Sequence, residues 1–234
     1  MNNDPQIKIT VTANGPYIVT GRVPLAAELI ILSSSGRVDR WVPGESYPGQ
    51  DTYALCRCGR SESKPFCDGS HLKAGFKDAR YNRQQPYFEE ADVIKGPGIT
   101  LYDVPPLCAL ARFCHRHGSI WEIAATASEP AGVEAVKEDA GDCPSGRLVA
   151  AGGAGAEPIE PRLKPAISLV EMPAEGISGS LWVKGGIPVV SGDGQPYETR
   201  NRVTLCRCGA STNKPFCDGS HHATGFNDGS EAVR

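Results

Sequence analysis

Three cysteines and one histidine occur at the same spacing in two places in the chain. Each place reads C-x-C, then eight residues, then C-D-G-S-H. Thiolates and imidazole are the side chains that bind zinc, iron and iron–sulfur clusters. Nine cysteines in 234 residues also favour metal ligation or redox chemistry over a disulfide framework in a reducing compartment. The sequence therefore predicts two metal centres, with the ligands Cys56, Cys58, Cys67, His71, Cys206, Cys208, Cys217 and His221.

The spacing favours iron–sulfur clusters and leaves structural zinc as an alternative. Paired zinc ligands are commonly about two to four residues apart, so C-x-C is tight for zinc. A 2Fe-2S cluster divides four ligands between two irons, so Cys56 with Cys58 can serve one iron and Cys67 with His71 the other. We expect the loop to turn at Pro65, and residues 68–70 to form a cap or turn that presents the histidine.

Ligation by histidine would change the chemistry of such a cluster. A neutral imidazole in place of a thiolate lowers the negative charge and so raises the reduction potential. It also adds a ligand that acid can remove from the metal. These properties predict one-electron transfer, pH-sensitive redox sensing, or transfer of an intact cluster to an apo-protein.

Both sites lie within an internal repeat. Residues 55–76 recur as 205–226 with six differences, and the alternating stretch 15–25 resembles 179–189. The many glycines and prolines favour short strands and turns. We therefore expect a mainly β fold with small α content, in which two β-rich modules pack with intrachain pseudo-twofold symmetry around a small α+β middle segment.

The repeat also predicts how the halves are organised. The boundaries are 1–95 for the first module, 96–165 for the middle segment and linker, and 166–234 for the second module. Strands near 7–32 and 166–190 should pair or pack in one body, with the two sites side by side and His71 and His221 both near solvent. Extra residues in the first half, around 36–50, should form a surface loop.

The middle segment contains the three remaining cysteines, Cys108, Cys114 and Cys143. Two helices are expected there, at 105–117 and 130–141, followed by a linker at 150–165. On a helix, the first two of these cysteines would point roughly 120° apart.

Each repeated site matches in full the pattern C-x-C-x2-(S/T)-x3-P-x-C-D-G-(S/A/T)-H of the mitoNEET-type CDGSH iron-sulfur family. The matches include Ser61 with Pro65 in the first copy and Ser211 with Pro215 in the second. The chain thus resembles family members with two modules in one chain. The resemblance implies one 2Fe-2S cluster per module, with the paired cysteines on an inner iron and the third cysteine and the histidine on an outer, more exposed iron.

The middle segment resembles a divergent mono-cluster ferredoxin-like domain, through Cys143 in DCPSGRL and the two cysteines before it. A third iron–sulfur cluster there would need a fourth ligand, for which Asp103, His115, His117 and solvent are candidates. The alternative is that Cys108, Cys114 and Cys143 are small buried apolar residues without a metal.

The composition and the motifs of the sequence argue against several other classes of function. A net charge of −3 and scattered basic residues argue against a nucleic-acid partner, and the absence of a long apolar stretch or a signal-peptide pattern predicts no membrane association and a cytoplasmic location. No nucleotide-binding or hydrolase motif supports an enzyme. A redox partner or an apo-protein cluster acceptor is expected, with the chain an intrachain pseudo-dimer that is monomeric or homodimeric. The alternatives are a zinc-binding interaction protein and an accessory redox subunit of an enzyme.

Overall fold

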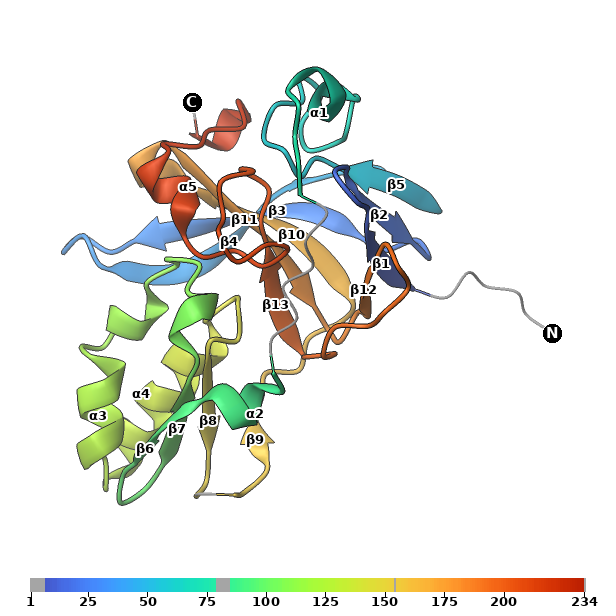
Figure 1. Ribbon diagram of the computed structural model, residues 1–234. Coiled ribbons are helices and arrows are strands. Elements are labelled where there is room, and N and C mark those ends of the chain that lie inside the picture. The colour runs from blue at the N-terminus through green and yellow to red at the C-terminus, as the bar shows by residue number, and fades with distance from the viewer. Residues whose placement is uncertain (1–6, 79–84, 154, 234) are drawn as a thin grey trace.

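The computed structural model describes residues 7–78, 85–153 and 155–233, and its strands form three sheets (Figure 1). Two sheets combine strands from both halves of the chain, and the third belongs to the middle segment. Helices are short and lie mainly in the middle segment. The predicted fold class, mainly β with two β-rich modules flanking a small α+β segment, is confirmed.

The first sheet has the strand order β12-β1-β2-β5. Along β1, β2 and β5, buried and less buried side chains alternate, as expected when one face of a sheet packs on the core. β12 comes from the second half and pairs in parallel with β1, with Ile9 opposite Val189. The strands are β1 (Lys8–Val11), β2 (Tyr17–Thr20), β5 (Thr52–Leu55) and β12 (Val189–Ser191).

The second sheet has the order β13-β11-β10-β3-β4. Its strands from the second half are buried along almost their whole length, so other elements cover both faces. β3 comes from the first half and pairs in parallel with β10, with Leu25 opposite Ile167. The strands are β3 (Leu25–Leu32), β4 (Val38–Ser46), β10 (Ala166–Met172), β11 (Ile177–Lys184) and β13 (Arg202–Leu205).

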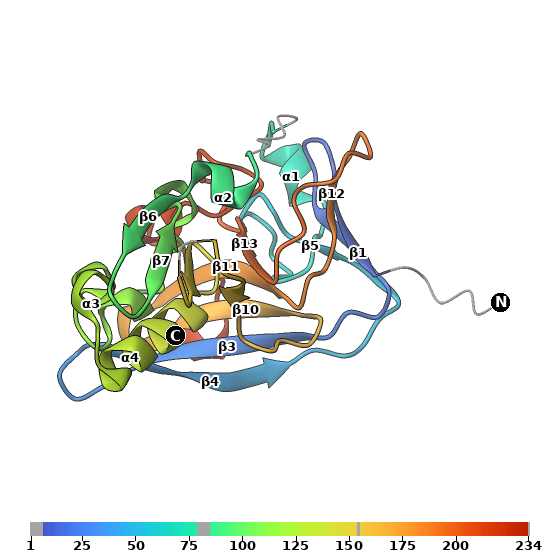
Figure 2. The same ribbon diagram turned by 90° about the horizontal axis from the view of Figure 1, so that it is seen from below.

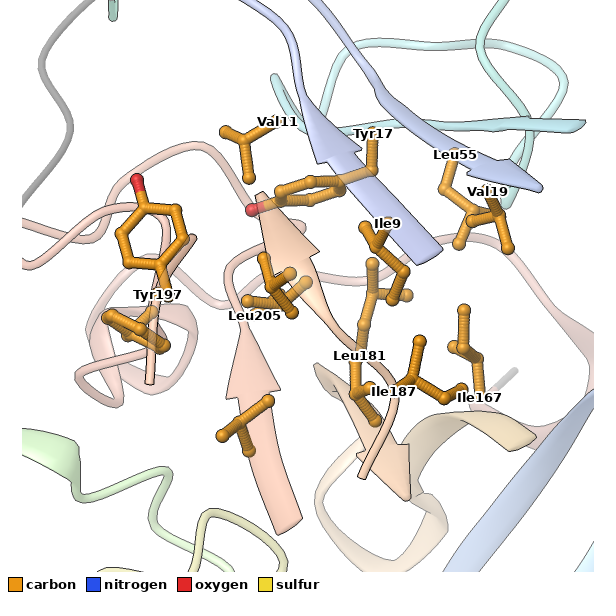
Figure 3. Packing of buried hydrophobic residues seen from close by; sticks show 14 of the residues in the cluster. Ile9, Val11, Tyr17, Val19, Leu55, Ile167, Leu181, Ile187, Tyr197 and Leu205 are labelled. Carbon is orange, nitrogen blue, oxygen red and sulfur yellow. The ribbon is translucent and has the colours of Figure 1, made fainter. Parts of the chain in front are cut away.

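Each of these two sheets therefore contains a strand from the opposite half of the chain. The predicted pairing between strands near 7–32 and 166–190 is confirmed by the β1–β12 and β3–β10 pairs. Hydrophobic side chains of both halves form one core, in which Tyr17 and Leu55 lie with Leu181 and Leu205 (Figure 3). Because this core is shared, neither half buries its apolar surface alone.

The extra residues of the first half form a strand, so the predicted surface loop at 36–50 is wrong. β4 pairs antiparallel with β3 along the edge of the second sheet. Its Trp41 stacks on Phe113 of the middle segment with ring centroids 4.8 Å apart, and its ring centroid lies 4.9 Å from that of Trp182. The stretch has glycines and prolines and only a weak alternation, and the aromatic partners that stabilise it come from distant parts of the chain.

The middle segment is a four-stranded antiparallel sheet packed against two helices (Figure 1). Its sheet begins at Asp92, slightly before the predicted boundary at 96, and the predicted linker at 150–165 supplies the end of β8 and all of β9. The elements are β6 (Asp92–Lys95), β7 (Thr100–Asp103), α3 (Ile120–Thr126), α4 (Pro130–Gly141), β8 (Leu148–Ala151) and β9 (Pro158–Ile159).

The two helix predictions had different outcomes. The helix at 130–141 is confirmed as α4, whereas 105–117 is not a helix. Leu110 and Arg112 have φ of 55° and 64°, in the left-handed region, so the chain bends twice where a helix would continue. Helix α3 was not predicted, although Ser119 and Glu122 form the S-x-x-E pattern of a helix start, and the Ser119 hydroxyl accepts from the Glu122 amide at 3.4 Å.

The remaining helices are single turns: α1 (Ser70–Lys73) in the first module, α2 (Tyr87–Glu90) before the middle segment and α5 (Ser220–Ala223) in the second module. Helices α3 and α4 lie at the end of the molecule away from α1 (Figures 1 and 2). Within the described ranges, no helix has the length and apolar character needed to cross a membrane. The 3₁₀ turns are η1 (Pro105–Leu107), η2 (Phe113–His115), η3 (Pro173–Glu175) and η4 (Glu231–Val233).

Candidate metal centres

The structure brings the predicted ligands of the first module together as two pairs. The Sγ atoms of Cys56 and Cys58 are 3.9 Å apart at the end of β5. The Sγ atom of Cys67 lies 3.4 Å from Nδ1 of His71, which α1 carries in its first turn. The amide of Cys67 donates to the carbonyl of Ala54 at 2.9 Å, so the backbone of the second pair begins beside the end of β5.

The second module repeats this arrangement. The Sγ atoms of Cys206 and Cys208 are 3.6 Å apart after β13, and Cys217 Sγ lies 3.4 Å from Nδ1 of His221 on α5. In both copies Nδ1 is the ring nitrogen that faces the cysteine. In the part of the chain that the structure describes, no group of three or more His, Cys, Asp or Glu side chains meets around one point.

The separations within the pairs fit two ligands on one tetrahedral metal. With metal–sulfur bonds of about 2.3 Å and metal–nitrogen bonds of about 2.0–2.1 Å, tetrahedral angles place two sulfurs about 3.8 Å apart and a sulfur and a nitrogen about 3.6 Å apart. All four pairs lie within a few tenths of an ångström of these values. Each module thus offers two separate pairs of metal donors, which together consist of three sulfurs and one nitrogen.

Residues between the ligands hold the loop in place. The hydroxyl of Ser61 donates to the carbonyl of Phe66 at 2.7 Å and accepts from the amide of Ser63 at 3.0 Å. The carboxylate of Asp68 accepts from the amides of Glu62 and Ser70 at 2.8 and 2.9 Å. The predicted turn before His71 is present, and its Gly69 has φ of 87°, a value that favours glycine. These hydrogen bonds recur in the second copy at Ser211 and Asp218.

The sequence analysis missed the residue between the paired cysteines, which is a buried arginine in both copies. Arg57 pairs with Asp78, and its guanidinium donates to the backbone carbonyl of Thr12 at 3.3 Å. Arg207 pairs with Asp228 and Glu171, both at 2.5 Å. The sequence repeat could have indicated these arginine–aspartate pairs, because Asp78 and Asp228 align when the repeat is extended by two residues. Each guanidinium is therefore balanced by buried carboxylates, and its hydrogen bonds anchor the backbone between the two cysteines.

Ionisation of the second module's ligands reflects their burial and close contact. The pKa of Cys208 is lowered to about 7 because Cys206 hydrogen-bonds to its thiolate, and that hydrogen bond, together with burial, raises the pKa of Cys206. Burial raises the pKa of Cys217 and lowers the pKa of His221 to about 3. A buried imidazole is thus held in the neutral form that can ligate a metal.

The two cysteine loops contact each other directly. A Cβ atom added at Gly59 would collide with the carbonyl of Cys208, and one added at Gly209 would collide with the carbonyl of Cys58. Only glycine allows this reciprocal approach. Beside it lies an open cleft of about 450 Å³, which Phe76 and its counterpart Phe226 help to line. The predicted side-by-side placement of the two sites is thus seen in the contact between their loops.

The two modules differ in exposure, and the prediction that both histidines lie near solvent is wrong for His221. His71 is partly exposed, whereas His221 is 1% exposed. The middle segment covers the second module: an added Cβ at Gly219 would lie 2.7 Å from Leu110 and 3.2 Å from the carbonyl oxygen of Cys108, whereas one at Gly69 would meet nothing within 4 Å. This burial of the second module comes from a segment distant in the sequence, so the repeat alone could not predict it.

The three cysteines of the middle segment come together around one small cavity. Cys108, Cys114 and Cys143 all line a space of about 20 Å³ between the 108–114 loop and the start of β8. The bends at Leu110 and Arg112 turn the loop so that both of its cysteines reach this space. Burial raises the pKa of Cys114 to about 12, with the other two thiols adding to the shift.

The candidate fourth ligands named from the sequence do not line this cavity. Asp103 accepts from Arg147 at 2.6 Å and from Trp121 at 2.8 Å. His117 lies 2.9 Å from Asp139, and the ring of His115 packs against Trp121. The cavity wall instead contains Ser145, whose Oγ is 3.5 Å from Cys143 Sγ.

One buried arginine ties the middle cysteines to the second module. Arg202, on β13, is 1% exposed and donates to the carbonyls of Ala140 and Gly141 at the end of α4 and to that of Cys143. Its guanidinium also pairs with Glu160 at 2.8 Å. Arg202, which hydrogen-bonds to the backbone of Cys143, thus lies four positions before Cys206 in the chain. Its contacts connect the middle cysteines to the second module.

Comparison with known families agrees with this division of the chain. The model of the iron-binding zinc finger CDGSH type matches residues 14–72 and 178–222, and the model of the divergent 4Fe-4S mono-cluster matches residues 94–152. No curated protein matches the chain. The repeated modules and the middle segment are therefore each recognised separately.

Proposed function

We propose that this iron–sulfur protein is a one-electron carrier with a 2Fe-2S cluster in each of its two CDGSH-type modules. The proposal is supported by the matches of both modules to the iron-binding CDGSH type and of the middle segment to the divergent 4Fe-4S mono-cluster. Cys56, Cys58, Cys67 and His71 would hold the first cluster. Cys206, Cys208, Cys217 and His221 would hold the second. When bound, such a cluster supplies a reversible one-electron redox couple.

The observation that carries this proposal is the arrangement of the ligands as two pairs per module. A 2Fe-2S cluster takes two protein ligands on each iron, and each pair has the spacing of two ligands on one metal atom. A structural zinc ion would need all four donors around a single point.

Electron transfer is favoured over donation of clusters by the contact between the modules. The loops that carry Cys58 and Cys208 touch through Gly59 and Gly209. An electron needs a short path between centres, whereas release of a cluster needs exposed ligands, and Cys217 and His221 are both almost fully buried. Cluster transfer and pH-sensitive redox sensing remain functions that the ligand set permits for the more exposed first module.

The middle cysteines are candidate ligands of a third iron–sulfur cluster, for which the space of about 20 Å³ between them would have to widen. Cys108, Cys114 and Cys143 line one cavity, and the divergent 4Fe-4S mono-cluster model covers this segment. Arg147, which also lines the cavity, would place a positive charge beside a negative cluster. The bend of the 108–114 loop removes the geometric objection that a helix would point its two cysteines apart.

Anaerobic purification followed by iron, acid-labile sulfide and zinc analysis tests the proposal. Two 2Fe-2S clusters require about four irons and four sulfides per chain, and a third cluster adds three or four irons. Visible absorption should accompany the iron. A preparation with stoichiometric zinc, no sulfide and no visible absorption would contradict the proposed function.

A further inference from the structure

The two modules carry the same ligands but present different surfaces. The middle segment covers the second module through Leu110 and Cys108, which approach Gly219. The amide of Asn213 donates to the carbonyl of Pro106 at 3.1 Å, and His222 lies 3.5 Å from Glu175. The equivalents in the first module, Ser63 and Leu72, are exposed, the latter by 77%.

The charge around the two sites also differs. Residues 60–77 of the first module contain four cationic side chains and two carboxylates, so their net charge is +2. Residues 210–227 of the second module contain one of each, so theirs is 0. The cations that only the first module has are Arg60, Lys73 and Lys77, all exposed, and the second module has Ala210, Ala223 and Asn227 at these positions.

From this asymmetry we propose that the first module is the docking face for an acidic redox protein, and that the second module reaches this partner only through the first. The docking face consists of Arg60, His71, Leu72, Lys73 and Lys77. The inference rests on the proposed electron-carrier function. A large exposed apolar side chain next to His71 in the sequence, in a segment that carries exposed cations, suits a transient partner that is steered by charge and bound by apolar contact.

Contacts inside the molecule determine the order in which an electron would pass between the three candidate cluster sites. The middle cavity adjoins the second module, because Cys108, which lines the cavity, brings its carbonyl close to Gly219. The second module adjoins the first through Gly59 and Gly209. The three sites therefore form a series with the second module in the middle.

The docking arm of the test uses oxidised plant-type 2Fe-2S ferredoxin, an acidic redox protein, and measures its equilibrium binding to the oxidised holoprotein. No electron moves in this measurement. Lys73→Glu should weaken binding at low salt by about threefold to tenfold, because it reverses a charge on the docking face. Lys95→Glu makes the same change of net charge on β6, and Ala223→Glu places a carboxylate at the equivalent position of the second module. Each of these controls should change binding by less than about twofold.

A second pair of variants, one on the docking face and one control, tests the apolar part of this face. Leu72→Ser should weaken ferredoxin binding, whereas Val93→Ser, at a residue 43% exposed on β6, should not. Absence of ferredoxin binding, or equal effects of Lys73→Glu and Ala223→Glu, would overturn the docking face. An equal effect of Lys95→Glu would show that only net charge matters, which also overturns it.

The electron arm follows reoxidation of the reduced protein by the Fe(III)–EDTA anion in stopped flow. Each event moves one electron from the protein to Fe(III)–EDTA, which becomes Fe(II)–EDTA, and transfers no atom or proton. In Cys67→Ser, chosen to remove the first cluster, reoxidation of the second cluster should be at least about tenfold slower than in the parent. The variant's elution volume and remaining visible absorption establish that it is folded and still loaded.

An unchanged rate in Cys67→Ser would show that the second module reacts directly with outside molecules, and the inference would fail. That failure is distinct from failure of the proposed function. Clusters that are present but equally accessible refute only the inference about the docking face. A parent protein without iron and sulfide refutes the electron-carrier function itself.

Discussion

The hydroxyl of Tyr17, in the first half of the chain, donates to the backbone carbonyl of Cys206 in the second half at 2.8 Å. The carbonyl of Pro215 lies 3.1 Å from the same oxygen. Burial raises the pKa of Tyr17 well above its ordinary value, so this hydroxyl stays protonated and remains a donor. The first module therefore fixes the backbone that carries a predicted ligand of the second.

Removing this hydroxyl should destabilise the fold and disturb the second site. We expect Tyr17→Phe to lower the free energy of unfolding by about 1–2 kcal/mol, because it removes a buried hydrogen bond to the Cys206 carbonyl. Tyr53→Phe is the matched control, since the Tyr53 hydroxyl donates to Val23 within the first half. Both variants should lose stability in denaturant titrations, but only Tyr17→Phe should speed the loss of iron from the second site. Equal iron loss in both would contradict the role assigned to the Tyr17 contact.

Substituting the ligand histidines separates the chemistry of the two sites. His71→Cys and His221→Cys should each retain a cluster and lower the reduction potential of that site alone, because thiolate adds negative charge. Potentiometric titration followed by visible absorption measures both potentials in each variant. A variant in which neither potential moves would show that the histidine at that position is not a ligand.

The middle cysteines can be tested without altering either CDGSH module. Simultaneous replacement of Cys108, Cys114 and Cys143 by serine should remove the iron beyond four per chain, together with its paramagnetic signal. If these cysteines are only packed, iron should remain at about four while stability falls by roughly one to a few kcal/mol. Iron analysis and electron paramagnetic resonance of the same preparations distinguish the two results.

Arg202 should matter more for the middle site than for the second module's own ligands. Arg202→Met removes the donors to Ala140, Gly141 and Cys143 and leaves Glu160 without its cation, at a cost of about 3–5 kcal/mol. Arg22→Met, at an exposed ion pair with Asp51, should change stability by less than about 1 kcal/mol. Limited proteolysis should then cleave the middle segment first in Arg202→Met. Cleavage at the same rate as in the control would argue against this anchoring role.

Cutting the chain between the halves should not separate them. A protease site placed between β8 and β9 would leave two fragments joined by the β1–β12 and β3–β10 pairs and by the shared core. The cut protein should elute from a sizing column at the position of the intact chain. Two separate peaks under native conditions would mean that the halves are independent domains.

The local pattern of ligands and strands could be predicted from the sequence, whereas contacts between distant segments could not. Spacing and repetition identified Cys56 to His71 and their copies, and alternation indicated the exchanged strands. The helix expected at 105–117 failed because Leu110 and Arg112 adopt left-handed conformations, which apolar periodicity does not reveal. The burial of His221 depends on a loop more than a hundred residues earlier in the chain. The two copies of the motif have the same ligand pattern, so the motif could not predict that their histidines differ in exposure.

The strand pairs between the two halves also affect how far the sequences of the two modules can diverge. In a symmetric homodimer every substitution appears twice, so both sites must change together. Here the β1–β12 and β3–β10 pairs join the two copies, yet each copy is encoded separately. A change such as Lys73 in one copy and Ala223 in the other therefore affects one site alone. Joining the copies in one polypeptide frees them to specialise, one for the inside of the molecule and one for the outside.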